Sequence, residues 1–153
     1  MSVVTGGHTA NLNGNNFEGF VESIINSKMG YSSIANSKAK SKTDVLIRQY
    51  PYTTMYGHNG RLDYMLNHGG KSYFIECKLQ TVAGSVDEKL PYTLMNMNQH
   101  DGVKIIVIDG DGWKDGAVDW LYDASKRTDV LVMNLEKFEK FINNLPTEEN
   151  NLW

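Results

Sequence analysis

The chain has 153 residues, 41% of them hydrophobic, which is enough for one globular domain with a single core. It is too short for a catalytic domain and a separate recognition domain. One cysteine, no secretory leader and no apolar run of roughly 18 residues indicate a soluble protein without a membrane span, with the cytoplasm as the expected location. The net charge of −3 argues against a sequence-independent coat on DNA, which would need an excess of Lys and Arg.

Charge is distributed unevenly along the chain. Residues 101–123 hold six aspartates and two lysines, whereas residues 28–48 hold five basic residues and one acid, Asp44. The basic residues are Lys28, Lys38, Lys40, Lys42 and Arg48. This polarity is compatible with one side of the protein facing a polyanion, and equally with two solvated surface segments.

The first predicted element is a helix that follows a polar start. Glycines and asparagines before Phe17 favour turns over packing, so residues 1–16 are expected to be flexible. Apolar residues recur at helical spacing from Phe17 to Lys28, and Gly30 is placed to end this helix. Glu18 and Glu22 lie one turn apart on its more polar side.

Three strands are predicted next, at Asp44–Gln49, Arg61–Asn67 and Ser72–Gln80. Side chains alternate along a strand, so Leu62, Tyr64 and Leu66 of the middle strand are expected to share the face opposite Asp63. In the last strand, Glu76, Lys78 and Gln80 share one face with Phe74, and the apolar face opposite includes Cys77. Because Asn67–Lys71 supplies a turn, a hairpin would bring Asp63 beside Glu76.

The second half of the chain alternates helices and strands, which indicates a mixed α/β fold. Pro91 suits the first turn of a helix, where its missing donor costs little, and Lys104–Asp109 is an apolar, β-branched run typical of a buried strand. A polar tail follows Pro146. The remaining elements are expected at Asp87–Asn98 (helix), Asp115–Lys126 (helix), Val130–Met133 (strand) and Leu135–Asn144 (helix).

Two acids and a lysine on neighbouring strands suit the cleavage of a phosphodiester. That reaction needs a cation to offset charge on the phosphate and to make water a better nucleophile, and Mg²⁺ takes one or two carboxylate ligands while keeping several waters. Asp63 and Glu76 are the expected ligands. Lys78 lies roughly 7 Å along the strand from Glu76, within reach of water or phosphate.

These residues resemble the PD-(D/E)xK, or restriction-endonuclease-like, nuclease superfamily, over about Phe17 to Asp109. Leu62 replaces the proline of the family name, which is a common variation. The resemblance implies a restriction-endonuclease-like core, a mixed β-sheet flanked by helices in the order αβββαβ. A C-terminal αβα extension follows here, within a single domain over residues 17–146 and ahead of a tail at residues 147–153.

The same resemblance implies roles for particular residues. Mg²⁺, for which Mn²⁺ is a possible substitute, would be bound by Asp63, Glu76 and the backbone carbonyl of Cys77, and Lys78 would assist hydrolysis. Gln80 extends the motif to ExKxQ, a form in which the glutamine supports the site or contacts substrate. Glu18 matches the acid that some members carry on the first helix, and Glu22 is the alternative.

Contacts to nucleic acid are expected from three segments. The run Gln80–Tyr92 is similar to a segment of restriction and phage nucleases. This similarity implies that Ser85 binds nucleic acid and that Lys89 approaches the DNA backbone or the metal site. The segment Tyr50–Gly60 is interpreted as a substrate-reading loop through Tyr56 and His58, or else as a surface loop packed on the sheet edge. The third segment is basic, and its Lys38, Lys40 and Lys42 are expected to contact nucleic acid.

The expected function is therefore that of a metal-dependent endodeoxyribonuclease, of a restriction-type or phage-encoded kind, acting through a metal-activated water. Cutting both strands requires two sites, so a homodimer or a higher symmetric oligomer is the natural assembly. A Holliday-junction resolvase of the same superfamily is the alternative. A catalytically inactive module that binds nucleic acid or protein belongs to a different class, and intact Asp63, Glu76 and Lys78 argue against it.

Overall fold

A computed structural model describes residues 14–30, 33–35, 44–84 and 86–146. The expected flexible start up to residue 13 and the tail at residues 147–153 lie outside the described residues, as do Lys38, Lys40, Lys42 and Ser85. No helix in the described part of the chain is long and apolar enough to cross a membrane.

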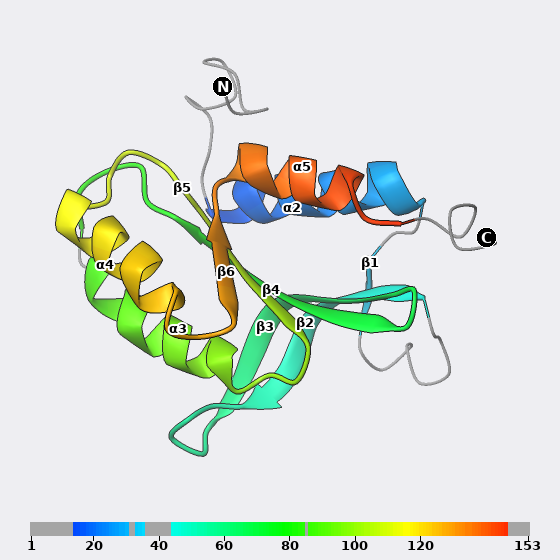
Figure 1. The fold of residues 1–153 in the computed structure, drawn as a ribbon, viewed down its shortest axis with the longest axis horizontal. Coiled ribbons are helices and arrows are strands. Elements are labelled where there is room, and N and C mark those ends of the chain that lie inside the picture. Colours follow the sequence, from blue (N-terminus) through cyan, green and yellow to red (C-terminus); the bar gives the residue numbers. More distant parts are fainter. Residues whose placement is uncertain (1–13, 31–32, 36–43, 85, 147–153) are drawn as a thin grey trace.

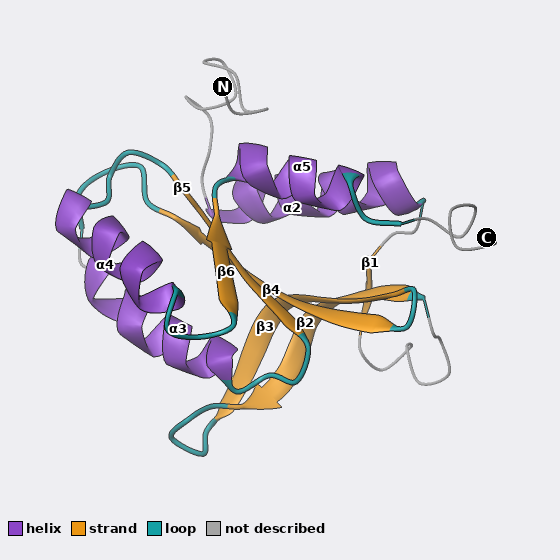
Figure 2. Ribbon diagram, in the orientation of Figure 1, coloured by secondary structure: helices purple, strands orange, loops and turns teal. Residues whose placement is uncertain are grey.

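One six-stranded sheet forms the centre of the molecule, with helices on both faces (Figures 1 and 2). The strands lie in sequence order from β1 to β6; β2, β3 and β4 are antiparallel, and the remaining neighbours are parallel. The elements are α2 (Gly14–Met29), β1 (Ser33–Ala35), β2 (Val45–Thr53), β3 (Asn59–His68), β4 (Lys71–Leu79), the 3₁₀ helix η2 (Val86–Lys89), α3 (Leu90–Asn98), β5 (Val103–Asp109), α4 (Asp115–Ser125), β6 (Val130–Met133) and α5 (Leu135–Asn143).

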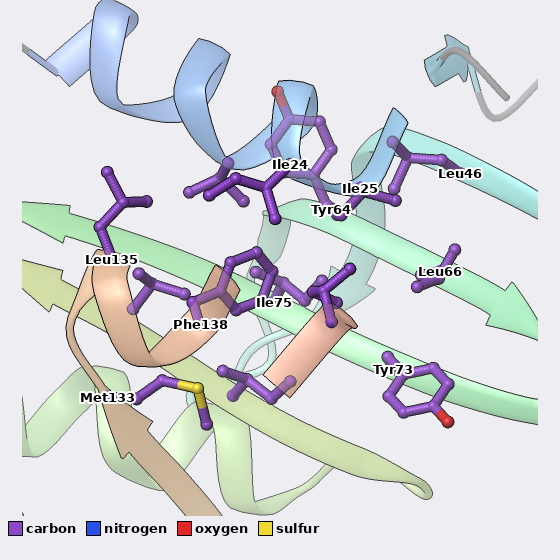
Figure 3. Packing of buried hydrophobic residues seen from close by; sticks show 14 of the residues in the cluster. Ile24, Ile25, Leu46, Tyr64, Leu66, Tyr73, Ile75, Met133, Leu135 and Phe138 are labelled. Carbon is purple, nitrogen blue, oxygen red and sulfur yellow. The ribbon is translucent and has the colours of Figure 1, made fainter. Parts of the chain in front are cut away.

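Each face of the sheet buries its own hydrophobic cluster. On one face α2 and α5 lie side by side and pack Phe17, Val21 and Phe138 against strand residues such as Ile75 (Figures 1 and 3). On the other face α3 and α4 contribute Leu90, Leu94, Met97 and Leu121, which pack against Phe74, Ile106 and Ile108. The sheet is therefore the middle layer of three, and a different pair of helices covers each of its faces.

The N-terminal helix begins and ends close to the expected residues. Gly30 ends it with φ +78°, and the Gly30 N–H donates to the Asn26 carbonyl at 2.7 Å, as the spacing predicted. Helix α2 starts at Gly14, three residues earlier than expected. Polar residues are tolerated there because the first N–H groups of a helix have no partner within it.

A two-residue turn closes the hairpin of β3 and β4. His68 pairs with Lys71, so Gly69 and Gly70 form the whole connection, and both have positive φ, 58° and 80°. This geometry matches the right-handed twist of the strands and suits glycine. The turn fixes the register in which Asn67 faces Ser72 and Tyr64 faces Ile75.

The segment Tyr50–Gly60, interpreted as a loop, is mostly strand. β2 continues to Thr53 and β3 starts at Asn59, and residues 54–58 connect them. Pro51, which argues against a strand, pairs with Arg61. Among the described residues, β1 pairs with β2 only from Leu46 to Arg48, so Pro51 has no described strand partner on that side, and a missing N–H is tolerated at such an edge.

Candidate active site

The strands β3 and β4 separate beyond the pair Tyr64 and Ile75, and two acids lie where they separate. In place of regular ladder bonds, the Asp63 N–H donates to Glu76 Oε1 at 3.1 Å. The Cys77 N–H donates to Asp63 Oδ2 at 2.8 Å. On its other side β4 stays paired with β5 as far as Leu79. We call this opening between β3 and β4 the fork, and it holds Asp63 beside Glu76.

The pairing of β2 with β3 is interrupted at the same level. Gln49 has φ +53°, in the left-handed region, and the ladder omits a pair between Gln49 and Asp63. A non-glycine residue there costs roughly 1–2 kcal/mol. The neighbouring pairs are intact: Arg48 with Tyr64, and Tyr50 with Leu62. The backbone of both strands is therefore distorted opposite the acid.

This interruption shifts the alternation of side chains in β3 by one residue. Leu62 packs with Met65 in the cluster beneath α3 and α4, whereas Tyr64 and Leu66 pack beneath α2 and α5. The expectation that Leu62, Tyr64 and Leu66 share one face is therefore wrong for Leu62. The physical reason is the distortion at Gln49 and Asp63, because regular alternation assumes an unbroken strand.

Burial makes Glu76 an unusual carboxyl group. Its side chain is 16% exposed, and burial together with the charge of Asp63 raises the pKa of Glu76 to about 8, against the lowering effect of Lys78. The Lys78 Nζ lies 3.7 Å from Glu76 Oε2. One nearby ammonium thus compensates only part of the cost of two carboxylates in a half-buried site. Additional positive charge at the fork would be favourable.

Helix α2 brings a third acid to this region. Burial and the charge of Asp63 raise the pKa of Glu18, and Lys78 lowers it, so Glu18 lies within the electrostatic range of both. Glu22 accepts a hydrogen bond at 2.8 Å from the hydroxyl of Tyr64, whose ring lies beneath α2 (Figure 3). Glu18 therefore interacts with the charges of the fork, and Glu22 bonds to Tyr64.

Gln80 has structural contacts at the end of β4. Its side chain is 6% exposed, and its Nε2 donates to the Gly112 carbonyl at 2.9 Å and to Asp87 Oδ1 at 3.4 Å. The Gly112 N–H donates in turn to the Gln80 carbonyl at 2.8 Å. These contacts connect the strand end to the loop after β5. They support the wall of the site, and a direct role for Gln80 stays a prediction.

A pocket of about 150 Å³ adjoins the fork. Glu76 and Lys78 line it from β4, and Tyr52 lines it from β2. The opposite wall comes from η2 and α3: Lys89, Tyr92, Thr93, Asn96 and Met97. The expected approach of Lys89 to the site is therefore present in the structure, whereas its contact with DNA stays a prediction.

Tyr56 and His58 lie at the connection between β2 and β3, where both are exposed. The Tyr56 ring stacks on Tyr92 of α3, with centroids 5.4 Å apart and planes at 23°. Its centroid lies 6.2 Å from that of His58. The Met55 N–H donates to Asn96 Oδ1 at 2.8 Å, which fastens the connection to α3. The predicted contacts of Tyr56 and His58 with nucleic acid stay predictions.

The residues from α3 were missed in the sequence. A signal was present, because Tyr92, Thr93 and Asn96 follow the predicted Lys89 at intervals of three and four and alternate with the apolar Leu90, Leu94 and Met97. Such a stripe is typical of any amphipathic helix with one polar side. Only the position of α3 beside the fork distinguishes it.

A family model described as a PD-(D/E)XK nuclease superfamily domain matches residues 9–145. No curated protein and no solved structure matches the chain. The mixed six-stranded sheet with helices on both faces is consistent with the restriction-endonuclease-like fold, and the expected α/β class is confirmed. The match covers most of the chain and includes the fork, the hairpin and every described helix. The chain therefore belongs to the PD-(D/E)XK nuclease superfamily.

Proposed function

We propose that this protein is a Mg²⁺-dependent endonuclease that hydrolyses phosphodiester bonds of DNA. Membership of the superfamily supports a nuclease-type activity on nucleic acid. The observation that carries the finer proposal is the fork, where Asp63 and Glu76 are joined by a 3.1 Å hydrogen bond with Lys78 Nζ 3.7 Å from Glu76. Two acids and a lysine at the open end of a hairpin are a suitable set for this hydrolysis.

The donors at the fork fit Mg²⁺. Asp63 and Glu76 offer only oxygen, and among residues 14–30, 33–35, 44–84 and 86–146 no three His, Cys, Asp or Glu side chains form a metal cluster. Mg²⁺ needs no such cluster, since it takes one or two carboxylates and retains water. The raised pKa of Glu76 supports the same assignment, because a divalent cation would offset the repulsion between the two carboxylates.

The backbone of Cys77 supports its proposed role as a ligand. The N–H and C=O of one strand residue point to the same side of the strand. Because the Cys77 N–H points to Asp63, the Cys77 carbonyl also faces the fork. The thiol belongs to the opposite face, where Cys77 packs against the cluster beneath α2 and α5. The Cys77 side chain thus packs in the core, while its backbone carbonyl is available as a metal ligand.

Each side chain at the fork has a proposed part in the reaction. A bound cation would offset charge on the scissile phosphate and lower the pKa of water. Lys78 approaches from the pocket side and stabilises negative charge on the phosphate, or accepts a proton from the attacking water. Glu18, on α2, adds a further carboxylate near Asp63 and Lys78 and helps to hold the water.

Cleavage of both strands would need two such sites, so we propose a homodimer or a higher symmetric oligomer, with no membrane contact. The small single domain suits a restriction-type or phage-encoded enzyme. The resolvase alternative is tested by including a four-way DNA junction among the substrates of the cleavage experiment.

The test compares cleavage of plasmid, linear duplex, single strand and four-way junction with Mg²⁺, with Ca²⁺ and with EDTA. We expect Mg²⁺-dependent cutting that Lys78→Ala lowers by about 100-fold or more. Lys71→Ala is the matched control, since Lys71 lies exposed at the far end of the same strand. Symmetric junction cuts would identify a resolvase. No cutting of any substrate, with wild type equal to Glu76→Ala, would refute the proposal and favour a binding module.

A further inference from the structure

The pocket beside the fork is the size of one small molecule. Its volume of about 150 Å³ corresponds to roughly five waters at about 30 Å³ each. Pockets for drug-sized ligands start at about 300 Å³, so this one is too small for a base pair. Because Glu76 and Lys78 line it, an occupant of the pocket would lie next to a phosphate bound at the fork.

The walls of the pocket are aromatic with a few polar groups. Tyr52 and Tyr92 contribute rings, Met97 a thioether, and the buried Thr93 and Asn96 add polar side chains. The Tyr52 ring is held edge-on against His100, with centroids 4.9 Å apart. This combination is typical of sites that bind a nucleobase, which has apolar faces and a polar edge.

The rim of the pocket carries exposed aromatic surface. The Tyr56 side chain is 66% exposed and stacks on Tyr92, which is 37% exposed. Lys89, exposed where η2 meets α3, adds positive charge at the same edge. Stacked aromatic rings beside a cation are the means by which proteins bind unpaired bases without reading a duplex.

We infer that this pocket receives one unpaired nucleobase of the substrate strand, next to the phosphate held at the fork. The inference rests on the proposed function and deepens it, because it names the form of DNA that the site prefers. In a fully paired duplex each base is stacked on its neighbours and must leave the stack to enter, which costs binding energy. A strand with an unpaired nucleotide at the cut avoids that cost.

The first test needs no cleavage. A short single-stranded oligonucleotide with 2-aminopurine at successive positions is titrated with protein in Ca²⁺, and its fluorescence falls where the base stacks. We expect quenching at one position with wild type and with Tyr92→Phe, and loss of quenching with Tyr92→Ala. Trp120→Ala is the matched control, because Trp120 is 41% exposed on α4 and does not line the pocket. Equal fluorescence at all positions would overturn the inference.

The second test measures kcat/KM on two duplexes that differ by one unpaired nucleotide. We expect wild type to prefer the unpaired substrate by about tenfold, a preference that Tyr92→Ala largely removes and Tyr92→Phe retains. If wild type cuts both duplexes with equal kcat/KM, the inference is overturned, and the observed cutting still supports the proposed function. If no DNA is cut, the proposed function fails, and the fluorescence titration still decides whether the pocket takes a base.

Discussion

Replacing Glu76 by Gln is expected to stabilise the metal-free fold. The unfolded chain loses the proton of this residue near pH 4.5, whereas burial and Asp63 raise the pKa to about 8 in the folded protein. The folded state therefore holds more protons between these values, and stability falls as pH rises through them. A tenfold change in acidity corresponds to about 1.4 kcal/mol, so the cost above pH 8 reaches at most roughly 5 kcal/mol.

Glutamine has no proton to lose and keeps the oxygen that accepts from the Asp63 N–H. Urea unfolding in EDTA would compare wild type with Glu76→Gln at about pH 5.5 and about pH 9. We expect the advantage of the variant to grow by up to roughly 3 kcal/mol between these values. Glu136→Gln is the matched control, because Glu136 is 21% exposed and also lies beside a lysine, Lys140, at 3.5 Å. An advantage that does not change with pH would refute the reasoning.

Three further predictions concern the metal, a turn and a hydrogen bond. Since Glu76 must lose its proton to bind a cation, Mg²⁺ affinity should rise with pH below about 8. Titration calorimetry of Mg²⁺ binding in two buffers of different ionisation enthalpy should show proton release. An affinity that does not depend on pH would contradict this prediction. Gly110→Ala should lower stability by about 2 kcal/mol or more in thermal unfolding, because φ is +94° and a Cβ would clash with the Gln80 carbonyl oxygen. Gly116→Ala, with open space around the added Cβ, should not lower stability. Tyr64→Phe should lower stability by about 1 kcal/mol in urea, because it removes the hydroxyl that donates to Glu22 at 2.8 Å and to the Glu18 carbonyl at 3.3 Å. An unchanged midpoint would show that this hydroxyl contributes nothing to stability.

Much of the fold follows from local patterns in the sequence. The strand Val130–Met133 has the expected bounds, and the expected helix Asp115–Lys126 ends one residue earlier. Helical spacing, β-branched runs and glycines at turns identify such elements because each depends on neighbours along the chain. The placement of Asp63 beside Glu76 was also predicted from the sequence, since a short turn and the alternation of side chains along each strand are enough to predict it.

The remaining features depend on contacts between distant segments. The strand β1 has only three residues and is defined by its parallel pairing with β2. The left-handed conformation at Gln49 has no signal in residue type, because glycine or asparagine would be the usual choice. The pocket depends on where α3 packs, and its polar stripe alone does not reveal a partner. These are the places where tertiary packing decides what local propensity leaves open.

The hairpin of β3 and β4 has a consequence for how the chain folds. Its two acids lie 13 residues apart in sequence and are joined by a two-glycine turn, so their contact is local and hairpins of this kind form within about 1–10 μs. Repulsion between the carboxylates is therefore encountered early, before the distant helices dock. We expect refolding to be faster in Mg²⁺ or at mildly acidic pH than in EDTA above pH 8. The two side chains proposed to bind Mg²⁺ would thus slow the formation of the structure that holds them.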